Sequence, residues 1–181
     1  MVLAPAERQA KETFAKVAGF YRNLGHPIPS DSYRKLGMEL ANRARIEALP
    51  GTGKTIRGFS DVDLLIVDEA ARVGDELYFA VRPMLAVSGG ALIMLTTPYG
   101  KRGVFYEEWT SGHGWERYEV PAAECPRISP EFLEEERMNL PPWVYRQEYE
   151  CSFEETEDQV FTTEMIDRAV TSEVKPLFGV G

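Results

Sequence analysis

A run of apolar residues that ends in two adjacent carboxylates constrains the fold of this chain more than any other feature. Residues 62–67 are nearly all apolar, and Asp68 and Glu69 follow them directly. Such a run is typical of a central β-strand that is covered on both faces. A second apolar run, at residues 91–97, predicts another buried strand. Because helical patterns separate the apolar runs, the sequence predicts an α/β fold with a mainly parallel sheet and flanking helices.

The other elements follow from periodicity and turn residues. Apolar residues recur at helical spacing through residues 6–24, and residues 75–87 show a helical pattern that Pro83 is expected to kink or break. Ser129 followed by Pro130 is a good start signal for a helix. Further predicted elements are a short strand at 2–4, a hairpin over 36–48, a helix at 103–110, a strand at 115–120, a helical turn from 141 to 150 and a last helix from 162 or 163 to about 170.

Composition narrows the classes of function. The chain has 181 residues, 44% of them hydrophobic, which suits one domain with its own core. A net charge of −9 argues against a free-standing, uniformly basic nucleic-acid binder. Two cysteines exclude a disulfide framework, and no apolar run approaches the ~20 residues of a membrane span. We therefore expect a soluble protein of a reducing compartment, with no membrane partner.

The two carboxylates after the first apolar run carry the strongest chemical signal. Ligands bind at the carboxyl ends of the strands in open α/β sheets. There, Asp68 is suited to hold Mg²⁺ through its water shell, and Glu69 to orient and deprotonate an attacking water. This is the Walker B pattern of nucleotide hydrolases with a catalytic glutamate. The alternative is that the pair only marks the start of a loop.

The second apolar run ends in two hydroxyl side chains, Thr96 and Thr97. In the additional-strand class of ATPases, the strand beside the Walker B strand ends in a residue that senses the terminal phosphate. The pairing with Asp68 and Glu69 favours this role over two threonines that merely end a strand.

A glycine-rich stretch at residues 48–55 formally fits a phosphate-binding P-loop that ends in Lys54 and Thr55. A working P-loop opens a helix, and a parallel crossover needs a dozen or more residues. Lys54 lies only 14 positions before Asp68, which leaves no room for both. We therefore predict a hairpin turn that mimics the motif, with an unusual phosphate-binding role for Lys54 as the alternative.

In combination, these motifs resemble the large terminase subunit of tailed bacteriophages, the ATP-driven motor that packages DNA. The resemblance covers roughly residues 1–161, and its acidic strand is the most specific part. The segments that carry it are Leu3-Ala4-Pro5 with Arg8-Gln9-Ala10, residues 48–51, Thr55-Ile56-Arg57-Gly58, residues 63–73, residues 81–90, residues 97–103 and Gln147-Glu148-Tyr149.

The resemblance implies a role for each matching residue. Asp68 would hold Mg²⁺, Glu69 would activate water, and Thr96 and Thr97 would belong to the motif that couples hydrolysis to movement. Arg57 resembles the arginine finger that acts on a neighbouring subunit's nucleotide. The implied cofactors are ATP and Mg²⁺. The implied partners are double-stranded DNA, the portal protein, the small terminase subunit and other large-subunit copies, in the host bacterial cytoplasm.

The sequence also departs from the family's pattern. The family's true P-loop lies upstream of the strand that residues 2–5 resemble, and its nuclease domain follows the region where this chain ends. We therefore expect residues 1–158 to form a partial ATPase domain, a P-loop-NTPase-like sheet that is incomplete at the N-terminus, and residues 159–181 to form a helix and linker. The missing strand is expected to leave an open edge next to residues 64–67. The isolated chain is expected to hydrolyse ATP poorly or not at all.

Two other functions stay open at this point. Asp68-Glu69-Ala70-Ala71 also resembles the Asp-Glu-Ala box of superfamily 2 helicases, although a second motor domain would not fit in this length. A non-enzymatic interaction module derived from a nucleotide-binding fold is the other alternative, and the absence of affinity for Mg²⁺-ATP would favour it.

Overall fold

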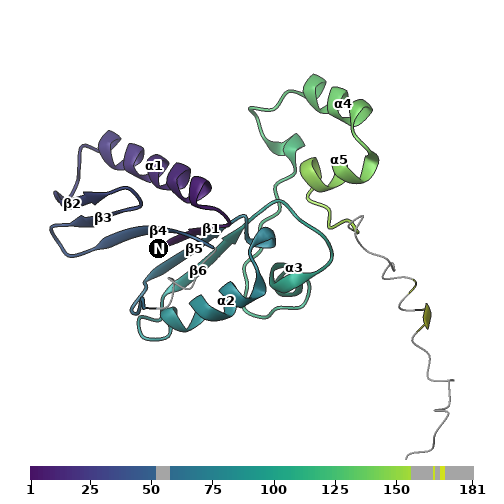
Figure 1. Ribbon diagram of the computed structural model, residues 1–181. Helices are drawn as coiled ribbons and strands as arrows, with labels where there is room; N and C mark the ends of the chain where they lie inside the picture. Colours follow the sequence, from purple (N-terminus) through teal and green to yellow (C-terminus); the bar gives the residue numbers. More distant parts are fainter. Residues whose placement is uncertain (52–57, 156–164, 166–167, 170–181) are drawn as a thin grey trace, which may run out of the picture.

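The computed structural model describes residues 1–51, 58–155, 165 and 168–169 of the chain. Within these residues lies one six-stranded sheet with the order β2-β3-β4-β1-β5-β6 (Figure 1). The pairs β4–β1, β1–β5 and β5–β6 are parallel, whereas the pairs β2–β3 and β3–β4 are antiparallel. The strands are β1 (Val2–Ala4), β2 (Ser30–Arg34), β3 (Gly37–Leu40), β4 (Arg45–Pro50), β5 (Leu64–Asp68) and β6 (Ala91–Leu95).

Helices cover both faces of the sheet. α1 (Glu7–Asn23) lies on one face, and α2 (Asp75–Val81) and α3 (Gly103–Thr110) lie on the other (Figure 1). A helical hairpin of α4 (Pro130–Asn139) and α5 (Pro142–Tyr149) projects beyond the sheet. Short 3₁₀ turns complete the described elements: η2 (Ala70–Arg72), η3 (Arg82–Leu85) and η4 (Ala122–Glu124). None of the helices in the described part of the chain is long and apolar enough to cross a membrane.

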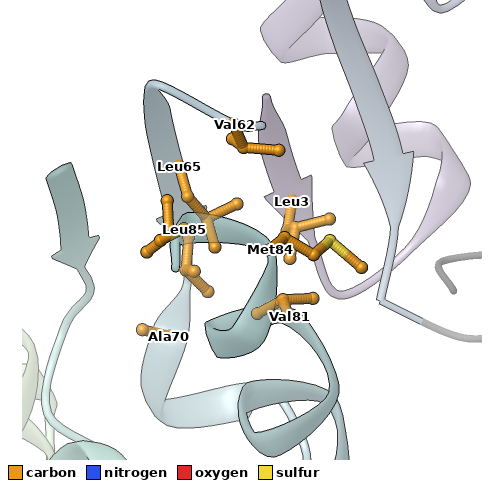
Figure 2. Packing of buried hydrophobic residues seen from close by; sticks show 8 residues of the cluster. Leu3, Val62, Leu65, Ala70, Val81, Met84 and Leu85 are labelled. Carbon is orange, nitrogen blue, oxygen red and sulfur yellow. The ribbon is translucent and has the colours of Figure 1, made fainter. Parts of the chain in front are cut away.

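Two apolar clusters hold these layers together, because alternate residues of β1 point to opposite faces. Val2 and Ala4 pack with Phe14 of α1, whereas Leu3 packs with the other cluster. That second cluster joins β1 and β5 to the α2–η3 segment; Figure 2 shows its members Leu3, Val62, Leu65, Ala70, Val81, Met84 and Leu85. The sheet is therefore the shared middle layer of both cores.

Much of the predicted order of elements is confirmed. The short strand at 2–4, the helix through 6–24, the hairpin and the helix at 103–110 all form. α2 ends at Val81 and continues as a 3₁₀ turn that contains Pro83, as expected of a residue that cannot donate a backbone hydrogen bond. Ser129 caps α4, because its Oγ accepts a hydrogen bond from the Phe132 amide at 3.2 Å.

Two strand predictions need correction, and one strand was missed. The run at 91–97 was expected to be buried, but β6 has a neighbour on one side only among the described residues, and Ile93 and Leu95 are 47% and 46% exposed. Residues 115–120 form no strand, because no strand among the described residues pairs with them. β2 was missed, since its residues are polar and mostly exposed.

The expected open edge next to residues 64–67 is also wrong. β5 pairs with β1 on one side and with β6 on the other. Its predicted coverage on both faces is only partly correct, because Leu65 and Val67 are buried whereas Leu64 is exposed. The unpaired edge lies one strand further out, at β6. Residues 52–55 of the stretch predicted to turn at 48–55 fall outside the residues that the structure describes, and so does the predicted last helix apart from residues 165, 168 and 169.

Candidate functional site

The candidate site lies at the carboxyl ends of two adjacent parallel strands. β5 ends at Asp68, which is in register with Leu95, the last residue of β6. The next residues along the chain are therefore Glu69 on one side and Thr96 on the other. The sequence-predicted pairs Asp68-Glu69 and Thr96-Thr97 meet at the same edge of the sheet, where open α/β sheets bind ligands.

Asp68 is held by two hydrogen bonds. Its Oδ2 accepts a hydrogen bond from the Thr13 hydroxyl of α1 at 3.2 Å, and its Oδ1 accepts one from the Glu69 amide at 3.1 Å. The side chain is half-buried. Each carboxylate oxygen accepts more than one hydrogen bond or ion contact, so these contacts orient Asp68 and leave it able to take a further ligand.

Glu69 occupies an unusual backbone position. It has φ 52° and ψ 44°, the left-handed region, which non-glycine residues seldom adopt. This conformation turns the chain sharply out of β5 and into the 3₁₀ turn η2. Backbone strain of this kind is concentrated at functional sites, where the surrounding structure enforces it. Here the enforcing contacts include the hydrogen bond from the Glu69 amide to Asp68.

Arg72 ties the Glu69 side chain to two other parts of the molecule. Its Nε lies 3.6 Å from Glu69 Oε2, and its guanidinium also lies 3.9 Å from Glu148 Oε1 of α5. The guanidinium stacks over the ring of Tyr99, 4.3 Å from its centroid. One arginine therefore joins the acidic strand end, the loop after β6 and helix α5.

The α5 end of this network is anchored in the interior. Gln147 is 5% exposed, and it is the only polar side chain that is buried among the described residues. Its Nε2 donates a hydrogen bond to Glu148 Oε1 at 3.1 Å, the same oxygen that faces Arg72. Arg72 and Glu148 are partly exposed, so each ion pair contributes little stability by itself. These contacts matter because they orient the side chains of Glu69 and Glu148.

Thr96 and Thr97 begin the loop that leads from β6 to α3. The Thr96 hydroxyl donates a hydrogen bond to the Thr97 carbonyl oxygen at 2.7 Å, and both side chains are half-buried. Pro98 and Gly100, further along the same loop, are buried, and Tyr99 contacts Arg72. The loop is thus linked to Glu69 through one intervening side chain.

The oxygen atoms at this edge fit a magnesium ion better than a transition metal. No group of three or more His, Cys, Asp or Glu side chains gathers anywhere among the described residues. Mg²⁺ needs no such cluster, because it keeps several waters and uses one or two carboxylates together with substrate phosphates. The Asp68 carboxylate beside the Thr13 hydroxyl provides a hard-oxygen donor set of that kind.

The junction where β1 leads into α1 at this edge is not a phosphate-binding loop. The junction from β1 to α1 contains Pro5 and Ala6 but no glycine, and Glu7 in the first helical turn would repel an anion. Lys54 and Arg57 lie outside the described residues, so the roles predicted for them stay untested. The hairpin turn predicted around Lys54 is wrong, because β4 and β5 lie on opposite sides of β1 and both run parallel to it, whereas a hairpin joins adjacent antiparallel strands. Residues 58–63 contain no helix.

Sequence reasoning missed Thr13 and Arg72. Arg72 could have been found, because it stands three residues after Glu69, the spacing of a favourable ion pair on a helical turn. Thr13 gives no local signal, since it reaches Asp68 from 55 positions away. The link from Arg72 to Glu148 is likewise a tertiary contact that sequence spacing does not indicate.

Comparisons with known proteins agree with this geometry. A family model described as the N-terminal part of the T4likevirus-type terminase large subunit matches residues 1–168. The large terminase subunit of Escherichia phage T5 is 26% identical over 178 residues, which is 90% of this chain and 39% of that protein. The chain therefore spans well under half the length of this curated relative.

Two solved structures share the fold. The large terminase ATPase domain of Thermus phage P74-26 has a TM-score of 0.62 and 21% identity, over 84% of this chain and 75% of that one. An arginine-to-alanine variant of the same domain has a TM-score of 0.63 and 20% identity, over 84% and 76% of the two chains. The α/β fold with flanking helices is thereby confirmed.

Proposed function

Because this chain belongs to the T4likevirus-type large terminase family, to which its residues 1–168 match, we propose that it forms part of the ATP-hydrolysing motor that packages phage DNA. The family match favours this role over the helicase-like alternative. The complete subunit is longer than this chain in the phage T5 relative, so this polypeptide supplies one part of the motor.

The observation that supports the proposal is the meeting of two strand ends. Asp68 stands in register with the end of β6. The carboxylates at the end of β5 and the hydroxyls that follow β6 therefore share one edge of the sheet. Asp68 would hold the Mg²⁺ of Mg²⁺-ATP, whose charge stabilises the phosphates during transfer. Glu69 would orient the attacking water and accept its proton.

The contacts around Glu69 suggest how the motor couples chemistry to movement. Arg72 contacts Glu69, stacks on Tyr99 in the loop after Thr96 and Thr97, and reaches Glu148 on α5. A shift of that loop or of α5 would therefore change the position of Glu69. In this proposal, Thr96 and Thr97 begin the coupling segment, and Arg72 links it to the catalytic carboxylate.

The remaining assignments rest on family membership. Arg57 would act as an arginine finger on the nucleotide of a neighbouring copy. The partners would be double-stranded DNA, the portal protein, the small terminase subunit and other large-subunit copies, in the host cytoplasm. Residues 1–158 would belong to the ATPase domain, and residues 159–181 would lead out of it.

The metal role of Asp68 can be tested with Mn²⁺-ATP as a paramagnetic substitute for Mg²⁺-ATP. We expect broadening of the amide NMR signals of Ala70, Thr96 and Thr13. Asp68→Asn should remove it, whereas Glu69→Gln should retain it, because Glu69 is assigned to water and not to metal. Broadening elsewhere, or broadening that survives Asp68→Asn, would contradict the proposed site.

Turnover is a separate test. We expect the isolated chain to release phosphate from ATP at close to the rate of a protein-free blank, because the described junction from β1 to α1 lacks the glycines that a phosphate-binding loop needs. Steady turnover that Glu69→Gln abolishes would refute the expected inactivity while supporting the role of Glu69. Retained partner binding without any affinity for Mg²⁺-ATP or Mn²⁺-ATP would favour the interaction module instead.

A further inference from the structure

One side-chain hydrogen bond joins the acidic end of β5 to helix α1. Thr13 Oγ1 donates to Asp68 Oδ2 at 3.2 Å, across 55 positions of sequence, and both side chains are half-buried. A threonine in a helix can instead donate to a backbone carbonyl oxygen one turn earlier, which needs no partner outside the helix. Because Thr13 donates to Asp68, α1 reaches the candidate site with a polar group.

The alternation of side chains along β5 explains why Asp68 meets α1. Successive residues of a strand point to opposite faces of the sheet. Leu65 and Val67 pack in the cluster beside α2, whereas Ile66 packs in the cluster that includes Phe14 of α1. Asp68 comes two residues after Ile66 and therefore points to the face of the sheet on which α1 lies (Figure 1).

Thr13 stands in a buried part of α1. Ala10 and Phe14, on either side of it along the helix, are 1% and 3% exposed and belong to the same apolar cluster as Val2 and Ala4 of β1. A β-branched side chain in a helix has few χ1 rotamers. The hydroxyl therefore keeps its position relative to β1, because neither the helix nor the side chain is free to turn.

The two carboxylate oxygens of Asp68 accept hydrogen bonds from different elements. Oδ2 accepts the one from Thr13 on α1, and Oδ1 accepts one from the Glu69 amide at 3.1 Å, where the chain leaves β5. Rotation of the carboxylate would break at least one of these hydrogen bonds. Asp68 therefore presents its remaining lone pairs in fixed directions, and a cation can bind only along them.

We propose that Thr13 is a positioning residue that makes the Asp68 site prefer Mg²⁺ to Ca²⁺. Ca²⁺ tolerates flexible geometry and takes carboxylates through one oxygen or both, whereas Mg²⁺ demands near-ideal octahedral geometry. A carboxylate whose Oδ2 is tied to α1 cannot turn both oxygens toward one cation. The hydroxyl thereby withholds the two-oxygen coordination that is available to Ca²⁺. This inference rests on the proposed function, in which Asp68 holds the metal of Mg²⁺-ATP.

Residues that orient a metal ligand have measurable effects although they do not touch the metal. Loss of such a partner typically lowers metal affinity by about 10- to 100-fold. In this proposal Thr13 acts on the cation only through Asp68. A threonine with a purely structural role would change the stability of the fold and leave the relative affinity for two cations unchanged. The ratio of the two affinities therefore distinguishes the positioning role from a structural one.

Amide NMR measures this ratio with two probes, Mn²⁺-ATP and Ca²⁺-ATP. Mn²⁺-ATP broadens nearby amide signals, and the Ca²⁺-ATP concentration that restores them gives the relative affinity. Thr13→Val removes the hydroxyl and keeps a branched side chain of similar size. We expect it to weaken the binding of Mn²⁺-ATP by about tenfold and that of Ca²⁺-ATP by less than about twofold, so that the preference falls by about fivefold or more.

Further variants show whether the hydroxyl is responsible. Thr13→Ser keeps a hydroxyl at the same position and should restore the preference. Val17→Ala removes a half-buried side chain one helical turn away, so it should lower the stability of the fold and leave the preference unchanged. If Thr13→Val does not fold by circular dichroism, Thr13→Ala removes the same hydroxyl with a residue of higher helix propensity. In the metal-free chain, the carboxyl carbon signal of Asp68 should move in Thr13→Val and stay in place in Thr13→Ser.

The outcomes separate this inference from the proposed function. An unchanged preference in Thr13→Val would overturn the positioning role, and loss of the broadening in Asp68→Asn would then still support the metal role of Asp68. Broadening that survives Asp68→Asn would overturn both. The same titrations with Mn²⁺ and Ca²⁺ alone cover the remaining case. A preference that depends on Thr13 without ATP, beside no binding of Mn²⁺-ATP, would support the positioning role and count against the nucleotide role of the site.

Discussion

The two outer strands of the sheet, β2 and β6, differ in polarity, in strand direction and in the regularity of their pairing. β2 is polar, pairs antiparallel and changes register between Ser30 and Ser32. Arg34 on β2 also pairs with Glu47 on β4. β6 is apolar, parallel and regular, and it exposes Ile93 and Leu95. Charged side chains and irregular pairing discourage further strand addition, and β6 has neither.

Of the two outer strands of the described sheet, only β2 therefore has the features that discourage a further strand from pairing. A strand with the composition of β6 normally lies inside a parallel sheet, with neighbours on both sides. The candidate site lies in the same half, because Asp68 follows β5 and Thr96 follows β6. The candidate site and the unpaired edge of β6 are therefore parts of one region, whereas β2 and β3 lie at the other border of the sheet.

The largest expected effect concerns the interior strands next to the two edges. Leu65 in β5 and Met38 in β3 are both 0% exposed, each one strand in from an outer strand. We expect Leu65→Ala and Met38→Ala each to lower the free energy of unfolding by about 3 kcal/mol, because both leave a cavity in a filled cluster. Chemical denaturation monitored by circular dichroism measures both losses.

The pair of variants tests the comparison directly. A loss below about 1 kcal/mol for Leu65→Ala, beside a full loss for Met38→Ala, would mean that the half next to β6 is loosely packed in solution. The exposure of Ile93 and Leu95 on β6 would then come from loose packing of this half of the sheet. Phe79→Ala is the surface control, and it should cost little because its side chain is largely exposed.

Amide exchange should show a smaller effect along β6 itself. The Ile93 amide, which points toward β5 like that of Ala91, should exchange on the order of tenfold more slowly than the Met94 amide, which points to the unpaired edge of β6. β5 provides the control, because it has partners on both sides and its successive amides should be protected alike. Equal protection at Ile93 and Met94 would show that the edge of β6 is covered in solution.

The contrast between the edges also explains which strands the sequence could predict. β6 has the composition of an interior strand, so it was expected to be buried. Its sequence contains no information on whether the next strand is present. Residues 115–120 were also expected to form a strand, although three of these six residues are charged. β2 escaped prediction, because the polar residues that protect an edge also remove the apolar alternation by which strands are recognised.

The candidate site divides along similar lines. Asp68, Glu69, Thr96 and Thr97 follow directly from apolar runs, so their meeting at one edge could be predicted from sequence and register. The contacts that orient them could not, because Thr13 and Glu148 reach the site through tertiary packing. Local motifs identify the reactive groups, and the fold decides what holds those groups in position.

The smallest predicted effect concerns the segment around Phe153, which lines a groove of about 790 Å³ beside β6. Glu154 accepts two hydrogen bonds from the Arg146 guanidinium, at 2.7 and 2.8 Å, and one from the Ser152 hydroxyl at 2.8 Å. The hydrogen bonds from Arg146, aided by Ser152, lower the pKa of Glu154 from its usual 4.5 to about 2. They fix the residue next to Phe153, whose ring contacts Trp109 in the lining of the groove.

A depressed pKa means that ionised Glu154 stabilises the fold above pH 4.5 and that this contribution fades as the pH falls toward 2. We expect Glu154→Gln to lower Tm by about 2 °C at pH 7, a small change because the pair is partly exposed. The difference from the unmodified chain should shrink through this window and vanish near its lower end. A constant difference down to pH 2 would show that the charges of Arg146 and Glu154 do not hold this segment in place. The aromatic contacts of Phe153 would then be what holds it.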